Sequence, residues 1–183
     1  MNKILVVLAL LGLAGCAPEK PLQVLGEVPD FQLIDQDARD FKSQSLEGRV
    51  WVADFIFTTC QGPCPRMSSH MRQIQDATDK SVQLVSFSVD PDNDTPAAFA
   101  AYAKGFGADL SRWHFLTGDK AILNSLGKDA FKLGGVGGGS VDHSTRFVLI
   151  DGKGQIRGYY GLSDGGVVSK IAKDAAALAK EQG

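Results

Sequence analysis

Two cysteines at the junction between an expected strand and an expected helix restrict most strongly how this chain can fold. Residues 50–57 are apolar and rich in β-formers, which predicts a buried central strand. Cys60 and Cys64 follow, and from Pro65 to about Lys80 apolar residues recur at helical spacing. Because proline suits the first turn of a helix, this order predicts a dithiol at the N-terminus of an amphipathic helix.

The rest of the chain alternates between strand and helix patterns. Thr95, followed by Pro96, predicts the N-cap of a helix, and Asp119 predicts the cap of another. The order predicts an α/β protein with a thioredoxin-like fold, in which helices flank a mixed central sheet and an N-terminal hairpin extends it. The expected strands lie at 31–34, from Phe41 onward, and at 50–57, 82–89, 113–116, 146–150 and 155–160; the expected helices lie at 65–80, 96–105, 119–126 and 167–179.

Length and charge limit the classes of function. A chain of 183 residues with 44% hydrophobic and 22% charged residues is typical of one globular domain. Lysine and arginine number 19 against 21 acidic residues, a net charge of −2, so there is no positive excess to neutralise phosphates. We therefore expect no nucleic-acid partner. Three cysteines are too few for a small domain held together by disulfides.

The N-terminus has the pattern of a bacterial lipoprotein signal. Lys3 precedes ten residues, 4–13, that are apolar or glycine, too few to span a bilayer. The sequence Leu-Ala-Gly-Cys that ends at Cys16 resembles a lipobox. We expect residues 1–15 to be a signal peptide, Cys16 to be lipidated, 16–25 to be a tether and 26–183 to be the domain, held on the extracytoplasmic (periplasmic) side. The alternative is an ordinary secretory signal with a cysteine near its cleavage site by chance.

The position of the cysteine pair favours a reactive dithiol or a metal site over a structural disulfide. A helix N-terminus offers unpaired N–H groups and partial positive charge, which favour thiolate over thiol. Thiolates serve redox exchange and metal binding equally. A structural disulfide between Cys60 and Cys64 would close so small a loop that it would add little stability. The CxxxC spacing alone does not choose between a reversible dithiol and a metal site.

A histidine near the last expected strands favours the metal. Thioredoxin-type oxidoreductases carry a cis-proline before a late strand, but this chain has no proline after Pro96 and has His143 at about that place, with Asp142 beside it. Two thiolates and one imidazole are three soft or intermediate ligands, which suit copper, whereas structural zinc normally takes four. The glycine-rich residues 134–140 predict a loop that lets copper enter and leave.

Other sulfur and imidazole side chains are expected to be structural. His70 is expected on the solvent side of its helix, and His114 in a short strand. Met67 and Met71 share one helix face, and a core position is expected for both in preference to thioether ligation.

Several spaced motifs resemble the Sco/SenC copper chaperone family over about residues 26–179. One is Phe-Thr-Thr-Cys with Cys-Pro, ending at Pro65, and another is Ser-Val-Asp-Pro with Asp-Thr-Pro, which ends at Pro96. Val-Asp-His-Ser around His143, Val-Pro-Asp-Phe ending at Phe31, Trp113 and Leu-Thr-Gly at 116–118 also fit. The chain departs from the family at Gln61, where proline is common, and in its glycine-rich run.

The resemblance implies a thioredoxin-like fold that binds one copper ion, Cu(I) in the first place and Cu(II) as a second option, through Cys60, Cys64 and His143. Asp90 and Asp142 are then expected to orient the ligands without binding the metal themselves. The family assists assembly of the copper centre of cytochrome c oxidase by copper delivery, by thiol reduction, or by both. The expected partner is thus a copper-receiving or thiol-containing protein, such as an oxidase subunit. Ala17 after the lipidated cysteine points to the outer membrane and an oxidase role to the inner one, so the membrane stays undecided.

Three functions therefore compete. A metallochaperone uses the cysteines and His143, and is a binding protein more than an enzyme. A metal-independent thiol–disulfide oxidoreductase would need only the cysteines. A thiol peroxidase would use one cysteine with Thr58 and Arg146 nearby, and the close second cysteine speaks against it.

Overall fold

A computed structural model describes residues 21–133 and 145–181 and confirms the predicted thioredoxin-like α/β fold. Six strands form one mixed sheet in the order β1-β8-β7-β4-β5-β6, and two form a separate hairpin. β4, β5 and β6 are parallel, whereas β7 is antiparallel to β4 and β8 to β7. The strands are β1 (Gly26–Glu27), β2 (Gln32–Ile34), β3 (Asp40–Lys42), β4 (Trp51–Ile56), β5 (Gln83–Ser88), β6 (Trp113–Leu116), β7 (Arg146–Ile150) and β8 (Gln155–Gly161).

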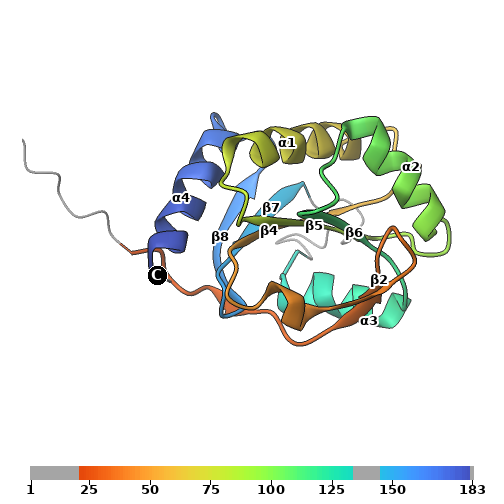
Figure 1. Cartoon of the computed structure of the whole chain (residues 1–183), viewed down its shortest axis with the longest axis horizontal. Coiled ribbons are helices and arrows are strands. Elements are labelled where there is room, and N and C mark those ends of the chain that lie inside the picture. Colours follow the sequence, from red (N-terminus) through yellow and green to blue (C-terminus); the bar gives the residue numbers. More distant parts are fainter. Residues whose placement is uncertain (1–20, 134–144, 182–183) are drawn as a thin grey trace, which may run out of the picture.

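Helices cover both faces of the sheet (Figure 1). One face carries α1 (Cys64–Ala77), α2 (Pro96–Phe106) and α4 (Val167–Glu181), and its core includes both buried methionines of α1. The other face carries α3 (Lys120–Ser125), the hairpin of β2 and β3, the 3-10 helix η1 (Ser43–Leu46) and the π-helix η2 (Leu126–Ala130). All six residues of β4 and all six of β5 are buried, as expected for parallel strands covered on both faces.

The caps predicted from the sequence are present. The Thr95 side chain accepts a hydrogen bond from the Ala98 N–H, and the Asp119 side chain caps α3. α2 runs past Gly105 to Phe106, and its C-cap is Gly107, whose φ of 65° supplies the left-handed conformation of a helix C-terminus. The π-helix after α3 was not predicted, because its hydrogen bonds leave no periodicity that differs clearly from an α-helix.

The N-terminal segment is held to the domain more firmly than a tether implies. The backbone N–H of Leu25 donates to Ile156, and the Arg157 guanidinium donates twice to the Leu22 carbonyl, at 2.7 and 3.2 Å. Arg157 also pairs with the buried Asp151 at 2.6 Å. Leu22 and Leu25, which lie in the predicted tether 16–25, are thus hydrogen-bonded to β8. Among the residues that the structure describes, no helix is both long and apolar enough to cross a bilayer.

Candidate functional site

Cys60 and Cys64 lie where the central strand passes into the first helix. β4 ends at Ile56, and Cys64 is the first residue of α1, so the pair lies at the carboxyl end of the parallel strands, where α/β proteins usually place their sites. Both are free thiols. Cys64 is only 3% exposed, whereas Cys60 is partly exposed in the connecting loop. The two sulfurs therefore differ in their access to solvent.

The pair is also electrostatically unequal. Burial disfavours ionisation of Cys60, but hydrogen bonds to its sulfur from the Cys64 thiol and from the N–H groups of Cys64 and Gly62 outweigh burial and lower its pKa. Burial raises the pKa of Cys64 to about 12, and its hydrogen bond to Cys60 adds to the rise. Cys60 is thus the sulfur that ionises first, and Cys64 keeps its proton until a metal or a bond replaces it.

Asp94 ties the cysteine loop to the next strand. Its side chain is fully buried, and its Oδ1 accepts hydrogen bonds from the N–H and the hydroxyl of Thr58, at 2.8 and 2.7 Å. Its Oδ2 accepts a bond of 2.5 Å from the hydroxyl of Ser88, the last residue of β5. Asp94 was not among the candidate residues named from the sequence, although it belongs to the Asp-Thr-Pro motif.

Asp90 lies in the turn that carries Asp94. Its carboxylate accepts a bond of 2.7 Å from the Asn93 side chain, and its carbonyl accepts the N–H of Asp94 at 2.9 Å. Its N–H donates to the Ser88 hydroxyl at 3.0 Å. These hydrogen bonds of Asp90 join it to residues 88–94 and not to the cysteine loop, so its support for that loop stays a prediction.

His143, Asp142 and Cys16 lie outside the residues that the structure describes. Description of the chain resumes at Thr145, just before β7. Because β7 is antiparallel to β4, it begins at the end of the sheet where β4 ends and the cysteines follow. Within the described ranges, 21–133 and 145–181, no cluster of three or more His, Cys, Asp or Glu side chains could hold a metal ion.

The remaining histidines and methionines have structural surroundings. His114 is half-buried and packs on Phe41 with ring centroids 4.8 Å apart, and burial lowers its pKa. His70 is half-buried, and its Nδ1 lies 2.9 Å from the Arg66 carbonyl on the same helix. Met67 and Met71 are fully buried, which confirms their predicted core positions.

A buried carboxyl group beneath α1 was missed by the sequence analysis. Asp54 lies in β4 with no exposed surface, and its Oδ1 accepts a bond of 2.6 Å from the Ser86 hydroxyl. Its Oδ2 has no hydrogen-bond partner in the described part of the chain. Burial raises the pKa of Asp54 to about 7, against the smaller effect of the Ser86 bond. The signal was an aspartate inside an otherwise apolar strand.

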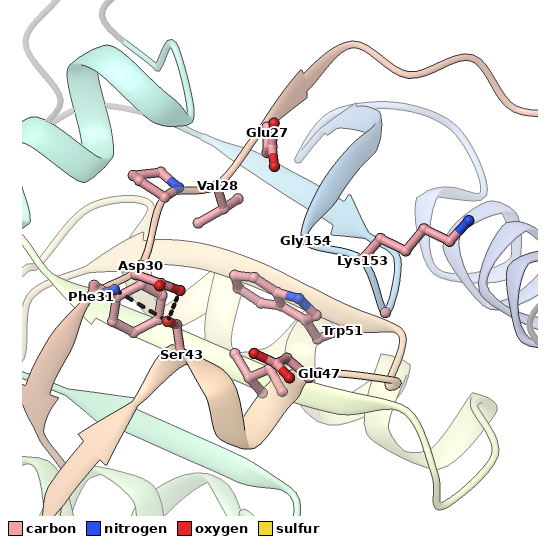
Figure 2. A pocket seen from close by; sticks show the side chains of 12 residues that line it. Glu27, Val28, Asp30, Phe31, Ser43, Glu47, Trp51, Lys153 and Gly154 are labelled. Atoms are coloured by element: carbon pink, nitrogen blue, oxygen red, sulfur yellow. Dashed lines mark hydrogen bonds between the residues drawn. The ribbon is translucent and has the colours of Figure 1, made fainter.

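A cavity of about 280 Å³ lies at the other end of β4. Figure 2 shows Trp51, the first residue of β4, beside Glu47, with the Ser43 hydroxyl donating to Asp30. The cavity contains neither cysteine. The reactive side chains, and not this hollow, therefore define the candidate site.

Comparisons of sequence and structure find known proteins that are similar to this chain. A family model described as SCO1/SenC matches residues 20–180. The solved SCO1/SenC family lipoprotein of Bacillus anthracis is 37% identical, with a TM-score of 0.75 over 89% of this chain and 99% of that one. BsSco, a member of the Sco family of cytochrome c oxidase assembly proteins with a disulfide switch, is 30% identical, with a TM-score of 0.76 over 88% and 99%. Bradyrhizobium japonicum ScoI with copper bound is 24% identical, with a TM-score of 0.67 over 83% and 99%, and shows the fold alone.

Proposed function

Because this chain belongs to the SCO1/SenC family, we propose that it binds one copper ion through Cys60, Cys64 and His143 and assists assembly of a copper centre in cytochrome c oxidase. The observation that carries the proposal is the placement of two thiols of unequal exposure and pKa at the N-terminus of α1. Copper in this role is a cargo that the protein takes up and hands on.

The donor set fits copper. Thiolates are soft ligands that select Cu(I), and imidazole suits both Cu(I) and Cu(II). Cys60 is partly exposed and ionises first, so it can engage the ion before the buried Cys64 loses its proton. A third ligand from residues just before β7 is supported by the start of that strand at the cysteine end of the sheet.

Copper stoichiometry in ligand variants tests the proposal. The reduced protein is expected to bind about one copper ion with sulfur ligands visible by X-ray absorption. Cys60→Ser and Cys64→Ser should abolish tight binding, and His143→Ala should weaken it. His114→Ala, which removes a histidine packed against Phe41, is the control. Binding without sulfur ligands, or binding unaltered in Cys64→Ser, would contradict the proposal.

Copper and a disulfide should exclude each other. A bond between Cys60 and Cys64 consumes the thiolates that the metal needs. The oxidised protein is therefore expected to take up little copper until it is reduced. Equal binding by both forms at the same site would refute a shared thiol pair.

A metal-independent thiol–disulfide oxidoreductase is the second candidate. The observation in its favour is the pKa difference itself, since a low-pKa exposed thiol beside a protonated buried one suits disulfide exchange. Measuring thiol exchange with a model disulfide beside copper binding distinguishes the oxidoreductase from the copper-binding protein. His143→Ala should leave the rate of exchange unchanged while it weakens copper binding. Reduction of a target protein and copper delivery to it are both compatible with the proposed partner, a copper-receiving or thiol-containing oxidase subunit.

We also propose that Cys16 carries lipid and anchors the domain to the extracytoplasmic face of a membrane. A solved relative is a lipoprotein, and residues 13–16 have the lipobox pattern. Wild-type protein should take up a labelled fatty acid and fractionate with membranes, and Cys16→Ala should do neither. If wild-type protein takes up no label and is found in the soluble fraction, the lipobox interpretation is wrong and the N-terminus is an ordinary secretory signal.

A further inference from the structure

We propose that Asp94 is the positioning residue of the cysteine pair: its buried carboxylate fixes the segment that carries Cys60 relative to the helix that carries Cys64. The inference deepens the proposed function and rests on it for copper. Its central claim concerns the dithiol alone, so it is tested first on protein without metal.

Asp94 joins the cysteine loop to the turn after β5, although Thr58 and Asp94 are 36 positions apart in the sequence. Oδ1 accepts both donors of Thr58, which stands two residues before Cys60. Oδ2 accepts the Ser88 hydroxyl at the end of β5. Hydrogen bonds to a carboxylate are about twice as strong as neutral ones, and a fully buried acceptor has no water to replace them.

Asp94 is itself held in place by its own turn and by the start of α2. The next residue, Thr95, caps α2, and the N–H of Asp94 is bonded to the carbonyl of Asp90. α2 is tied to α1 by a contact of 2.9 Å between the hydroxyls of Tyr102 and Ser68. The carboxylate therefore holds the Cys60 segment against α2, and α2 is in turn bonded to α1, the helix that begins with Cys64.

The loop has few other restraints. Beyond the bonds to Asp94, the segment is restrained from within residues 57–64, by a long bond of 3.3 Å from the Cys60 N–H to the Phe57 carbonyl and by the hydrogen bonds that the Cys60 sulfur accepts from Gly62 and Cys64. Residues 59, 61 and 62 are exposed. Loss of the carboxylate should therefore let the Cys60 segment sample more conformations, which lowers the effective concentration of one thiol at the other.

The dithiol–disulfide equilibrium with dithiothreitol measures that effective concentration. One reduced dithiothreitol gives two electrons and two protons to the Cys60–Cys64 disulfide, and the products are two protein thiols and cyclic oxidised dithiothreitol. In Asp94→Ala we expect the equilibrium to move about tenfold toward the dithiol, which corresponds to about 30 mV for a two-electron couple. Thr58→Val, which removes the hydroxyl donor and keeps the N–H, should move it in the same direction by less.

Asp94→Asn supplies the conservative rescue, because an amide oxygen can still accept both donors of Thr58. Its equilibrium should stay within about threefold of wild type. Asp151→Ala is the matched control: Asp151 is also a buried carboxylate with three donors, from Lys153, Gln155 and Arg157, but it lies in the turn between β7 and β8. It should lower the free energy of unfolding without moving the dithiol equilibrium.

Competition with a Cu(I) chelator adds the copper arm, in which Asp94→Ala should bind copper about tenfold more weakly than wild type. An unchanged dithiol equilibrium in Asp94→Ala overturns the inference, as does an equal shift in Asp151→Ala. Should Asp94→Ala not fold, an unchanged equilibrium in Thr58→Val overturns it instead. A wild-type protein that binds no copper refutes the proposed function and leaves the dithiol result standing.

Discussion

Replacement of Asp54 by asparagine should remove most of a pH dependence of stability that the structure places in β4. Asp54 is fully buried, and burial raises its pKa from 3.8 to about 7. The folded state therefore holds a proton that the unfolded state releases. The stability that comes from this protonated form is complete below about pH 4 and is lost as the pH rises through about 7.

The size of the effect follows from the two pKa values. A difference of one pKa unit is worth about 1.4 kcal/mol, so the shift of about three units corresponds to roughly 4 kcal/mol in total. Between about pH 5 and pH 8 the wild type should lose about 2 to 3 kcal/mol, because roughly one unit of the shift has already acted at the lower pH. Asparagine cannot ionise, and its amide oxygen can still accept the Ser86 hydroxyl.

Urea unfolding of the reduced, metal-free protein measures the effect. The free energy of unfolding is determined at about pH 5 and pH 8 for wild type and for Asp54→Asn, and the difference between the two proteins is compared. Because both contain the same cysteines, thiol ionisation cancels in that difference to first order. Asp40→Asn is the control, since Asp40 is exposed and its side chain has no hydrogen bond or ion pair within the described residues. Parallel pH profiles for wild type and Asp54→Asn would refute the reasoning.

Three further variants test how the fold is stabilised, each by urea unfolding. Thr95→Ala removes the N-cap of α2 and should cost about 1 kcal/mol, whereas Thr95→Ser should cost little. Arg157→Gln leaves Asp151 as a buried, unpaired carboxylate and releases the Leu22 carbonyl, so it should cost about 3 kcal/mol; a cost under about 1 kcal/mol would show that water replaces the guanidinium. Met71→Ala opens a cavity in the core and should cost about 2 to 5 kcal/mol, and no measurable cost would mean that the core repacks.

Elements with a strong local signal were predictable from the sequence. β4 and β5 are mainly apolar, and the starts of α2 and α3 follow from Thr95, Pro96 and Asp119, because a cap and its helix are close in the chain. The Sco/SenC resemblance, carried by spaced motifs, is confirmed by the family match. The end of α2 was placed too early, since Gly105 is tolerated inside the helix and the left-handed turn falls at Gly107.

Side chains that act over long sequence distances were not predictable. The choice of Asp90 over Asp94 illustrates this, because both stand in one motif and only the fold shows which carboxylate turns toward Thr58. Arg157 likewise has no local signal, since its partners are the Leu22 carbonyl and Asp151. Such contacts depend on which strands are neighbours, and sequence periodicity does not report that.

The difference between the two cysteines shows why a motif does not determine chemistry by itself. CxxxC gives two identical side chains at fixed spacing, and from the sequence either sulfur could be the reactive one. The fold separates them, because the first turn of α1 packs Cys64 into the core while the loop leaves Cys60 partly exposed. Burial raises the pKa of Cys64, whereas the pKa of Cys60 is lowered, against its own burial, by hydrogen bonds from the Cys64 thiol and from the N–H groups of Cys64 and Gly62. The order in which the two sulfurs react is therefore a property of the strand–helix junction and not of the spacing.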